Sequence, residues 1–313
     1  MANPAEKPVK ESVLIAGTGA LATLFAARLS ANGHPVCMLG SWQAGLDALQ
    51  NHGARLIEDN GREYSYPVRA TDNPKDCRGA RYALVLVKAW QTERAAGQLA
   101  ECLAENGLAL TLQNGLGNRE TLGLSLGLPR VALGVTTTGA TLLGPGLVRA
   151  GGEGLVSVEA HPRIGPLSAA LAESGFNVRQ VRDADSLVWG KLVINAAINP
   201  LTALLRVPNG ELLNRPAARE LMHALAEETA AVALAQGIPL PFKDAVKAAE
   251  NVARQTAKNH SSMFQDIQRG APTEIDAICG AITRAGKKTG VSTPVNRVCW
   301  HLTRASVMTN RRV

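Results

Sequence analysis

The sequence predicts an α/β domain followed by an all-α domain, and three observations support this division. The chain has 313 residues, more than one ordinary hydrophobic core holds, so two domains are expected. In the first half, short apolar runs alternate with helical patterns, as they do in βαβ units. From Leu187 onward the apolar periodicity is helical. We therefore expect a disordered leader at residues 1–10, the α/β domain at 11–184 and the helical domain at 185–313.

Composition excludes several classes of protein. A hydrophobic fraction of 46% with 19% charged residues is typical of a globular chain, and we expect no apolar run long enough to span a bilayer. The charged, proline-containing N-terminus does not resemble a signal peptide. The five cysteines are scattered without a Cys-x-x-Cys pair, and the histidines lack metal-type spacing. The sequence thus predicts buried thiols, a reducing cytoplasmic compartment and no metal site.

The net charge of +7 calls for a partner class. Aromatic residues are few, and no stacking motif for single-stranded nucleic acid is present. A modest positive field also attracts anionic small molecules. We therefore expect a small-molecule ligand and neither nucleic acid nor membrane; the oligomeric state stays open, with a homodimer among the options.

A glycine-rich turn carries the first functional signal. The apolar run 13–16 leads into Gly17-Thr18-Gly19-Ala20-Leu21-Ala22, and a helical pattern follows to Asn32-Gly33. In this strand–turn–helix context, Gly17 permits the tight turn and Gly19 lets a pyrophosphate approach the backbone. The helix start offers its N–H groups to phosphate. We predict a Rossmann-type dinucleotide-binding domain with cofactor contacts at Gly17, Gly19, Ala20 and Leu21.

The end of the next strand, residues 36–39, bears on the choice of nicotinamide cofactor. An acid at this place holds the ribose 2′-hydroxyl of NAD, whereas arginine or small polar groups accept the 2′-phosphate of NADP. Here Gly40-Ser41-Trp42 follows, with no acid before Asp47 and no arginine. The sequence favours NADP, with Ser41 as a candidate phosphate contact.

Two further strands end in polar residues. Residues 82–87 lead into Lys88, and 108–112 lead into Gln113-Asn114-Gly115. Ligands of open parallel sheets bind at the carboxyl ends of the strands, so Lys88 and Asn114 join the predicted site. The alternatives are a solvated loop lysine and a turn-forming Asn-Gly pair. Strands at 131–135, 146–149 and 155–158 are expected to extend the far edge of the sheet with antiparallel pairing, before a helix at 166–173 and a strand at 178–181.

The helical domain begins with an apolar helix that carries a polar stripe. Lys191, Asn195 and Asn199 recur every four residues in the run 189–205, which places them within an arc of about 80°. A helix that is apolar on its other sides is usually buried, and buried polar groups need partners such as an oxygen-rich ligand. Alternatively, Lys191 extends to water and the amides cap neighbouring backbone. Pro200 predicts a kink or break near Asn199.

Later helices are expected at 214–236, 241–258 and 272–288, with a last one from Pro294. Between them, Asn259 to Met263 is rich in short polar groups, and its simplest interpretation is a helix stop and restart. Glu274 has a structural alternative as well, because an acid in the first turn of a helix is favoured by the helix dipole.

Taken together, these motifs resemble the ketopantoate reductase family over nearly the whole chain from Val13 to about Val307. The resemblance rests on the glycine turn, Lys88-Ala89-Trp90-Gln91, Gln113-Asn114-Gly115, Lys191 with Asn195 and Asn199, the segment 259–266 and the segment 273–276. It implies an NADPH-binding first domain, reduction of ketopantoate in pantothenate biosynthesis and Lys191 as the catalytic lysine. It also implies substrate contacts from Asn195, Asn199, Ser262 and Glu274, roles near cofactor and substrate for Lys88 and Asn114, and a position near both for Asn259.

The chemistry of a 2-keto acid fits these residue types. Hydride transfer to the carbonyl carbon builds negative charge on its oxygen, which an ammonium such as Lys191 can stabilise and protonate as general acid. The amides suit the carboxylate, with Ser262 assisting, and Glu274 suits a substrate hydroxyl. Two alternatives stay open: a reductase or dehydrogenase of the same fold acting on another 2-keto or 2-hydroxy acid, and a non-enzymatic NADPH-sensing or nucleic-acid-binding module.

Overall fold

The computed structural model describes residues 10–58, 60–152 and 154–307. These residues form two compact units. The first contains the chain up to Val87, residues 91–113 and residues 119–182. The second contains residues 88–90, 114–118 and the chain from Asp183 on. Apart from Lys10, the predicted leader at 1–10 lies outside the described residues.

An eight-stranded sheet forms the centre of the first unit, in the order β12-β11-β8-β7-β6-β1-β2-β5. Its strands are β1 (Val13–Ala16), β2 (Val36–Leu39), β5 (Arg69–Thr71), β6 (Ala80–Val85), β7 (Leu103–Thr111), β8 (Val131–Thr136), β11 (Leu155–Glu159) and β12 (Asn177–Val181). Six neighbouring strands of this sheet are parallel, in the order β8-β7-β6-β1-β2-β5. This is the strand order of a dinucleotide-binding fold, with the switch point between β1 and β6. The predicted Rossmann-type architecture is confirmed.

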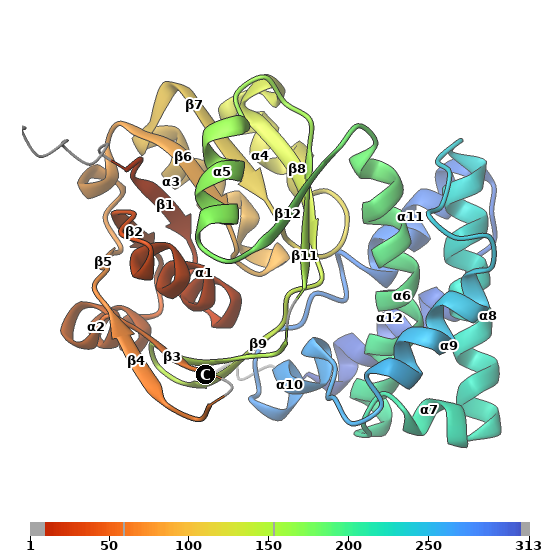
Figure 1. The fold of residues 1–313 in the computed structure, drawn as a ribbon. Coiled ribbons are helices and arrows are strands. Elements are labelled where there is room, and N and C mark those ends of the chain that lie inside the picture. The colour runs from red at the N-terminus through yellow and green to blue at the C-terminus, as the bar shows by residue number, and fades with distance from the viewer. Residues whose placement is uncertain (1–9, 59, 153, 308–313) are drawn as a thin grey trace, which may run out of the picture. The chain divides into compact units, whose positions relative to one another are not determined.

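Helices cover both faces of this sheet (Figure 1). Val13 and Ile15 of β1 share one core with α1 (Ala20–Ala31) and α5 (Gly165–Glu173). Leu14 and Ala16 share the other with α3 (Thr92–Cys102) and α4 (Asn118–Leu126). Successive side chains of a strand point to opposite faces of the sheet, so a strand that is covered on both faces is apolar at every position.

The predicted strand at 146–149 lies in a different sheet from the one expected. As β10 (Leu147–Ala150), it pairs with β9 (Ala140–Gly144) and β3 (Ala54–Ile57), and β4 (Glu63–Tyr66) completes a four-stranded sheet. The expected antiparallel extension at the far edge is correct only for β11 on β8. Sequence patterns missed β3, β4, β5 and β9 because these strands have only three to five residues and none of them is buried along its whole length. The helix α2 (Gln43–His52) follows β2.

The second unit is helical, as Figure 1 shows, and its longest helix is α6 (Ala184–Leu205). The other helices are α7 (Glu211–Asn214), α8 (Pro216–Ala235), α9 (Ala245–Gln255), α10 (Ser262–Gln268), α11 (Cys279–Thr289) and α12 (Pro294–Ser306). Helices α8, α9, α10 and α12 all contact α6. The buried side chains of α6 therefore form the middle of this core, as its apolar circumference predicts.

Helix α6 begins with a side-chain cap and passes through Pro200. Asp183 caps the helix by accepting a hydrogen bond from the Ser186 backbone N–H (2.9 Å). The helix is not broken at Pro200 but continues to Leu205. Its length of 22 residues and mean hydropathy of 1.3 are sufficient to cross a bilayer, contrary to the prediction from composition. Because 67% of its most apolar window is buried inside the protein, α6 has the character of a core helix.

The helix predicted at 272–288 begins later, at Cys279, and the residues before it form turns. The break between α9 and α10 is where a stop and restart was expected, with Ser261 as the N-cap that accepts from the Phe264 N–H (3.1 Å). All five cysteines are free, buried thiols, as predicted.

Candidate functional site

The glycine turn after β1 has the geometry that a phosphate-binding turn requires. Gly17 has a φ of +132°, and a Cβ there would lie 3.1 Å from the Leu86 backbone carbon. A Cβ at Gly19 would meet no atom within 4 Å, so the space above this residue is open. Gly19 is also the N-cap of α1 and supplies no side-chain cap to the helix. The first N–H groups of α1, at Ala20 and Leu21, thus belong to a helix start without a side-chain cap, which suits an anion.

The end of β2 lies against this turn. A Cβ at Gly40 would lie 2.6 Å from the Thr18 side chain, so a larger residue there would have to displace that side chain. The next residue, Ser41, accepts a hydrogen bond from the guanidinium of Arg94 on α3. Sequence reasoning found no arginine at this place because Arg94 is 53 residues away along the chain.

In the second unit, three predicted site residues meet at one carboxylate. Glu274 is only 6% exposed, and its Oε2 accepts a hydrogen bond from Asn114 Nδ2 at 3.0 Å. Its Oε1 accepts from the Ala89 backbone N–H at 3.1 Å, and Lys88 Nζ lies 3.7 Å from Oε2. Because α11 begins only at Cys279, Glu274 does not lie in the first turn of a helix, and that alternative is wrong. Its carboxylate is instead bonded to two distant segments, and Asn114 does more than form a turn.

A close backbone contact holds Asn114 in place. Gly115 has a φ of +84°, and a Cβ there would lie 2.5 Å from the Ala277 carbonyl oxygen. The Leu116 N–H donates to the same oxygen at 2.9 Å, and Asn118 Nδ2 donates to the Asn114 carbonyl at 3.0 Å. The Asn-Gly pair is therefore a turn whose function is to bring an amide to Glu274.

Asp266 completes the cluster, although it was not among the predicted site residues. It is 2% exposed on α10, and its Oδ2 lies 2.6 Å from Lys88 Nζ. Its Oδ1 also accepts from Arg269 at 3.2 Å. The signal was present in the sequence, because the resemblance included the segment that ends at Asp266. An acid near a helix C-terminus, where the dipole disfavours it, indicates a specific cationic partner.

Lys88 and Lys191, both in this unit, have opposite pKa shifts. Burial alone lowers the pKa of Lys88, but the neighbouring carboxylates of Glu274 and Asp266 outweigh it and raise the pKa above its usual value. For Lys191 the balance is reversed, since burial dominates and the charge of Glu274 offsets only part of it. The pKa of Lys191 falls to about 8. Lys88 is thus a fixed cation, and Lys191 can exchange its proton near neutral pH.

Comparison with known proteins identifies the family. The profile described as ketopantoate reductase PanE/ApbA matches residues 13–163, and its C-terminal counterpart matches residues 183–307. The chain belongs to the ketopantoate reductase family. These proteins are oxidoreductases, and the family fold, an N-terminal Rossmann-like domain with a helical C-terminal domain, is the fold described above.

Curated relatives of this chain are similar over almost its full length. The 2-dehydropantoate 2-reductase of Archaeoglobus fulgidus is 37% identical over 94% of this chain and 97% of that protein. The enzyme of the same name from Halobacterium salinarum is 32% identical over 93% and 97% of the two chains.

Solved structures include a PanE/ApbA family ketopantoate reductase from Ralstonia eutropha, with a TM-score of 0.88, 32% identity and coverage of 94% and 98%. A ternary structure of D-mandelate dehydrogenase with NADH and anilino(oxo)acetate also has a TM-score of 0.88, at 26% identity and the same coverage.

The other predicted site residues lie on α6, at the start of α10 and just before α10. Lys191 and Asn195 are half-buried and Asn199 is 7% exposed, so the stripe lies on a packed helix. Ser262 and Asn259 are exposed. The described contacts do not join Asn195, Asn199, Asn259 or Ser262 to the Glu274 cluster, and their roles stay predictions.

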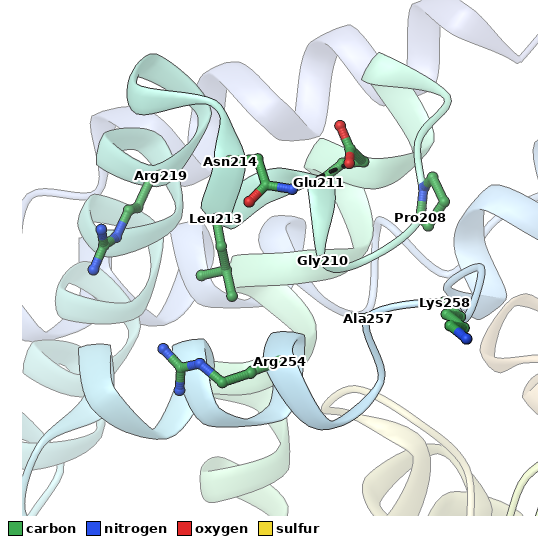
Figure 2. Close-up of a pocket in the computed structure, with 9 residues that line it drawn as sticks. All are labelled: Pro208, Gly210, Glu211, Leu213, Asn214, Arg219, Arg254, Ala257 and Lys258. Atoms are coloured by element: carbon green, nitrogen blue, oxygen red, sulfur yellow. Dashed lines mark hydrogen bonds between the residues drawn. The ribbon is translucent and has the colours of Figure 1, made fainter.

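A depression of about 640 Å³ elsewhere in the helical unit is a weaker candidate (Figure 2). Arg219 and Arg254 line it, but both are already paired with Glu250. It also lies at the C-terminal end of α9, where the helix dipole disfavours an anion. None of the predicted site residues lines it.

Proposed function

We propose that this chain reduces 2-dehydropantoate to pantoate with NADPH, a step of pantothenate biosynthesis, in the cytoplasm. The carbonyl carbon receives a hydride and the carbonyl oxygen a proton, so NADPH becomes NADP⁺ as the keto acid becomes a 2-hydroxy acid. Family membership supports the reaction class. The observation that supports it best in the structure is the buried Glu274 carboxylate, held by Asn114 and the Ala89 N–H, with Lys191 in its field.

Lys191 is the proposed general acid. A donor works best when its pKa is close to the working pH, because both protonation states are then accessible. Burial on α6 brings the pKa of Lys191 to about 8, and the nearby Glu274 keeps it from falling further. A protonated Lys191 stabilises the charge that develops on the carbonyl oxygen and then transfers its proton there.

Glu274 is the proposed acceptor for the hydroxyl of the substrate. Asn114 and the Ala89 N–H fix the direction of its carboxylate, and Lys88 balances its charge. Lys88 is itself anchored by Asp266. The amides of Asn195 and Asn199 are the proposed donors to the substrate carboxylate, with Ser262 and Asn259 at its margin.

The glycine turn of the first unit fits a nicotinamide dinucleotide. Gly17, Gly19 and the backbone of Ala20 and Leu21 would hold the pyrophosphate, because the turn leaves open space above Gly19 at a helix start. When bound, the reduced cofactor supplies the hydride. We propose NADPH rather than NADH, because Ser41 stands where NAD-binding proteins carry an acid.

A substrate comparison tests this function. The oxidation of NADPH is followed at 340 nm with ketopantoate and with ketoisovalerate, which lacks the hydroxyl group. A site built to bond that hydroxyl should prefer ketopantoate by orders of magnitude in kcat/KM. Glu274→Gln, which keeps the size of the side chain, should remove most of this preference. Equal rates with both substrates in the wild type would contradict the assignment of Glu274.

A second function has specific support in the similarity to D-mandelate dehydrogenase. On that basis the chain would interconvert an aromatic 2-keto acid and its 2-hydroxy acid with NADH. The same assay with benzoylformate and NADH separates the two proposals. A higher kcat/KM for benzoylformate than for ketopantoate would favour the dehydrogenase.

A further inference from the structure

We propose that Arg94, together with Ser41, forms the binding site for the 2′-phosphate of the dinucleotide. This inference rests on the proposed function, which assigns a nicotinamide dinucleotide to the first unit. The end of β2 has no cation of its own, and Arg94 on α3 would supply it.

The position of Arg94 follows from how α3 packs. Ala95, Ala96 and Leu99 of this helix are buried against the sheet, whereas Arg94 is exposed, near the start of the helix. From there its Nη1 reaches across to the hydroxyl oxygen of Ser41 and donates a hydrogen bond to it. The guanidinium is thus fixed at the residue that follows the end of β2 by two positions.

The end of β2 is the place where a dinucleotide presents its 2′ position. The pyrophosphate is held at the glycine turn, and the adenosine ribose lies at the end of the second strand of the βαβ unit. In this chain the two places are in contact, because Gly40 packs on the Thr18 side chain. Ser41 directly follows Gly40, so Ser41 and its partner Arg94 lie next to the glycine turn.

The chemistry at this place suits a phosphate better than a hydroxyl. A guanidinium binds phosphate oxygens through two parallel N–H donors, and the Ser41 hydroxyl, which accepts from Arg94, keeps its own proton to donate. Around the guanidinium, within the part of the chain that the structure describes, no carboxylate forms an ion pair with Arg94. The nearest acid along the chain after β2, Asp47, accepts from Gln43 at 2.6 Å. No acceptor equivalent to the NAD-type acid stands there.

The test measures nucleotide binding without a keto acid. The dissociation constants of 2′,5′-ADP and 5′-AMP, which differ only in the 2′-phosphate, are determined by isothermal titration calorimetry. The wild type should bind 2′,5′-ADP more tightly. Arg94→Met should weaken 2′,5′-ADP by about 10- to 100-fold, the effect of one or two charge-assisted hydrogen bonds, and leave 5′-AMP within about twofold. Arg94→Lys should lie between, since it keeps the charge but not the paired donors.

Arg78→Met is the matched control, because it removes an exposed arginine of the same unit that follows η1 (Pro74–Cys77). It should leave the ratio of the two constants unchanged. The proposal is overturned if Arg94→Met leaves that ratio unchanged, if it weakens both nucleotides equally, or if the wild type does not prefer 2′,5′-ADP. Failure of the keto-acid assignment would appear only in turnover and would leave these binding constants as they are.

Discussion

Two lysines of the helical unit carry the same charge in opposite environments. Lys88, on the short segment after β6, lies 2.6 Å from Asp266 and 3.7 Å from Glu274, and these two acids raise its pKa. Lys191 is on the apolar helix α6, where burial outweighs the one nearby acid and lowers its pKa to about 8. The balance between burial and close carboxylates thus sets the direction in which each lysine pKa shifts. Two close acids keep Lys88 protonated, whereas burial dominates at Lys191, which can release its proton near neutral pH.

The largest expected effect is on turnover. Lys191→Met should lower kcat with ketopantoate by about 10²–10³-fold, because the charge on the carbonyl oxygen then has no donor. The dissociation constant of NADPH, measured by fluorescence titration, should change little. A mutant that loses cofactor affinity but keeps its kcat would show that Lys191 is not the general acid.

The pH dependence of kcat distinguishes the two lysines next. If protonated Lys191 is the acid, log kcat should be level below its pKa of about 8 and fall with a slope of about one per pH unit above it. Lys88→Arg, which keeps a fixed cation, should retain this alkaline limb. The measurement is kcat from pH 6 to 10 at saturating substrate. An activity that stays level to pH 10 would contradict the assignment.

Stability should respond strongly to the loss of Lys88. Lys88→Met removes the cation that two nearly buried carboxylates share and leaves Arg269 on Asp266 alone, so we expect the free energy of unfolding to fall by about 1–3 kcal/mol, measured with urea. Adding Asp266→Asn should recover part of the loss, since one of the two buried negative charges is then removed. Arg219→Met, which breaks an exposed pair with Glu250, is the control and should cost clearly less. Equal losses in the two single mutants would show that Lys88 contributes no more to stability than an exposed ion pair does.

The expected effect of Lys191 on stability has the opposite sign. The folded state lowers the pKa of Lys191 from 10.5 to about 8, so at pH 7 the protein carries the cost of a desolvated ammonium. Lys191→Met should therefore raise the free energy of unfolding at pH 7 by about 1–3 kcal/mol while activity is lost.

The difference in stability between Lys191→Met and the wild type should depend on pH. Between pH 8 and 10.5 the unfolded chain binds the proton that the folded chain has released, so the wild type gains stability as pH rises. The advantage of the mutant should be complete below about pH 8 and vanish by about pH 10.5. Tm values of the two proteins that differ by the same amount at pH 7 and pH 10 would contradict a lowered pKa.

The sequence by itself determined the features that depend on local patterns. The glycine turn, the all-apolar strands and the buried helix with its polar stripe are each encoded within a few consecutive turns or strand residues, where periodicity and backbone freedom act directly. The βαβ alternation predicted a parallel sheet. The family resemblance then supplied the residues Lys88, Asn114, Lys191 and Glu274 as candidates for one site.

Only the tertiary structure decided which of these residues meet. The segments that carry Asn114 and Glu274 are 160 residues apart, and no local rule could show that they share a hydrogen bond. Arg94 stayed hidden for the same reason, as did the pairing of Asp266 with Lys88 and the separate sheet that contains β10. The pKa values of the two lysines likewise depend on desolvation and on charges brought close by folding, which a sequence does not record.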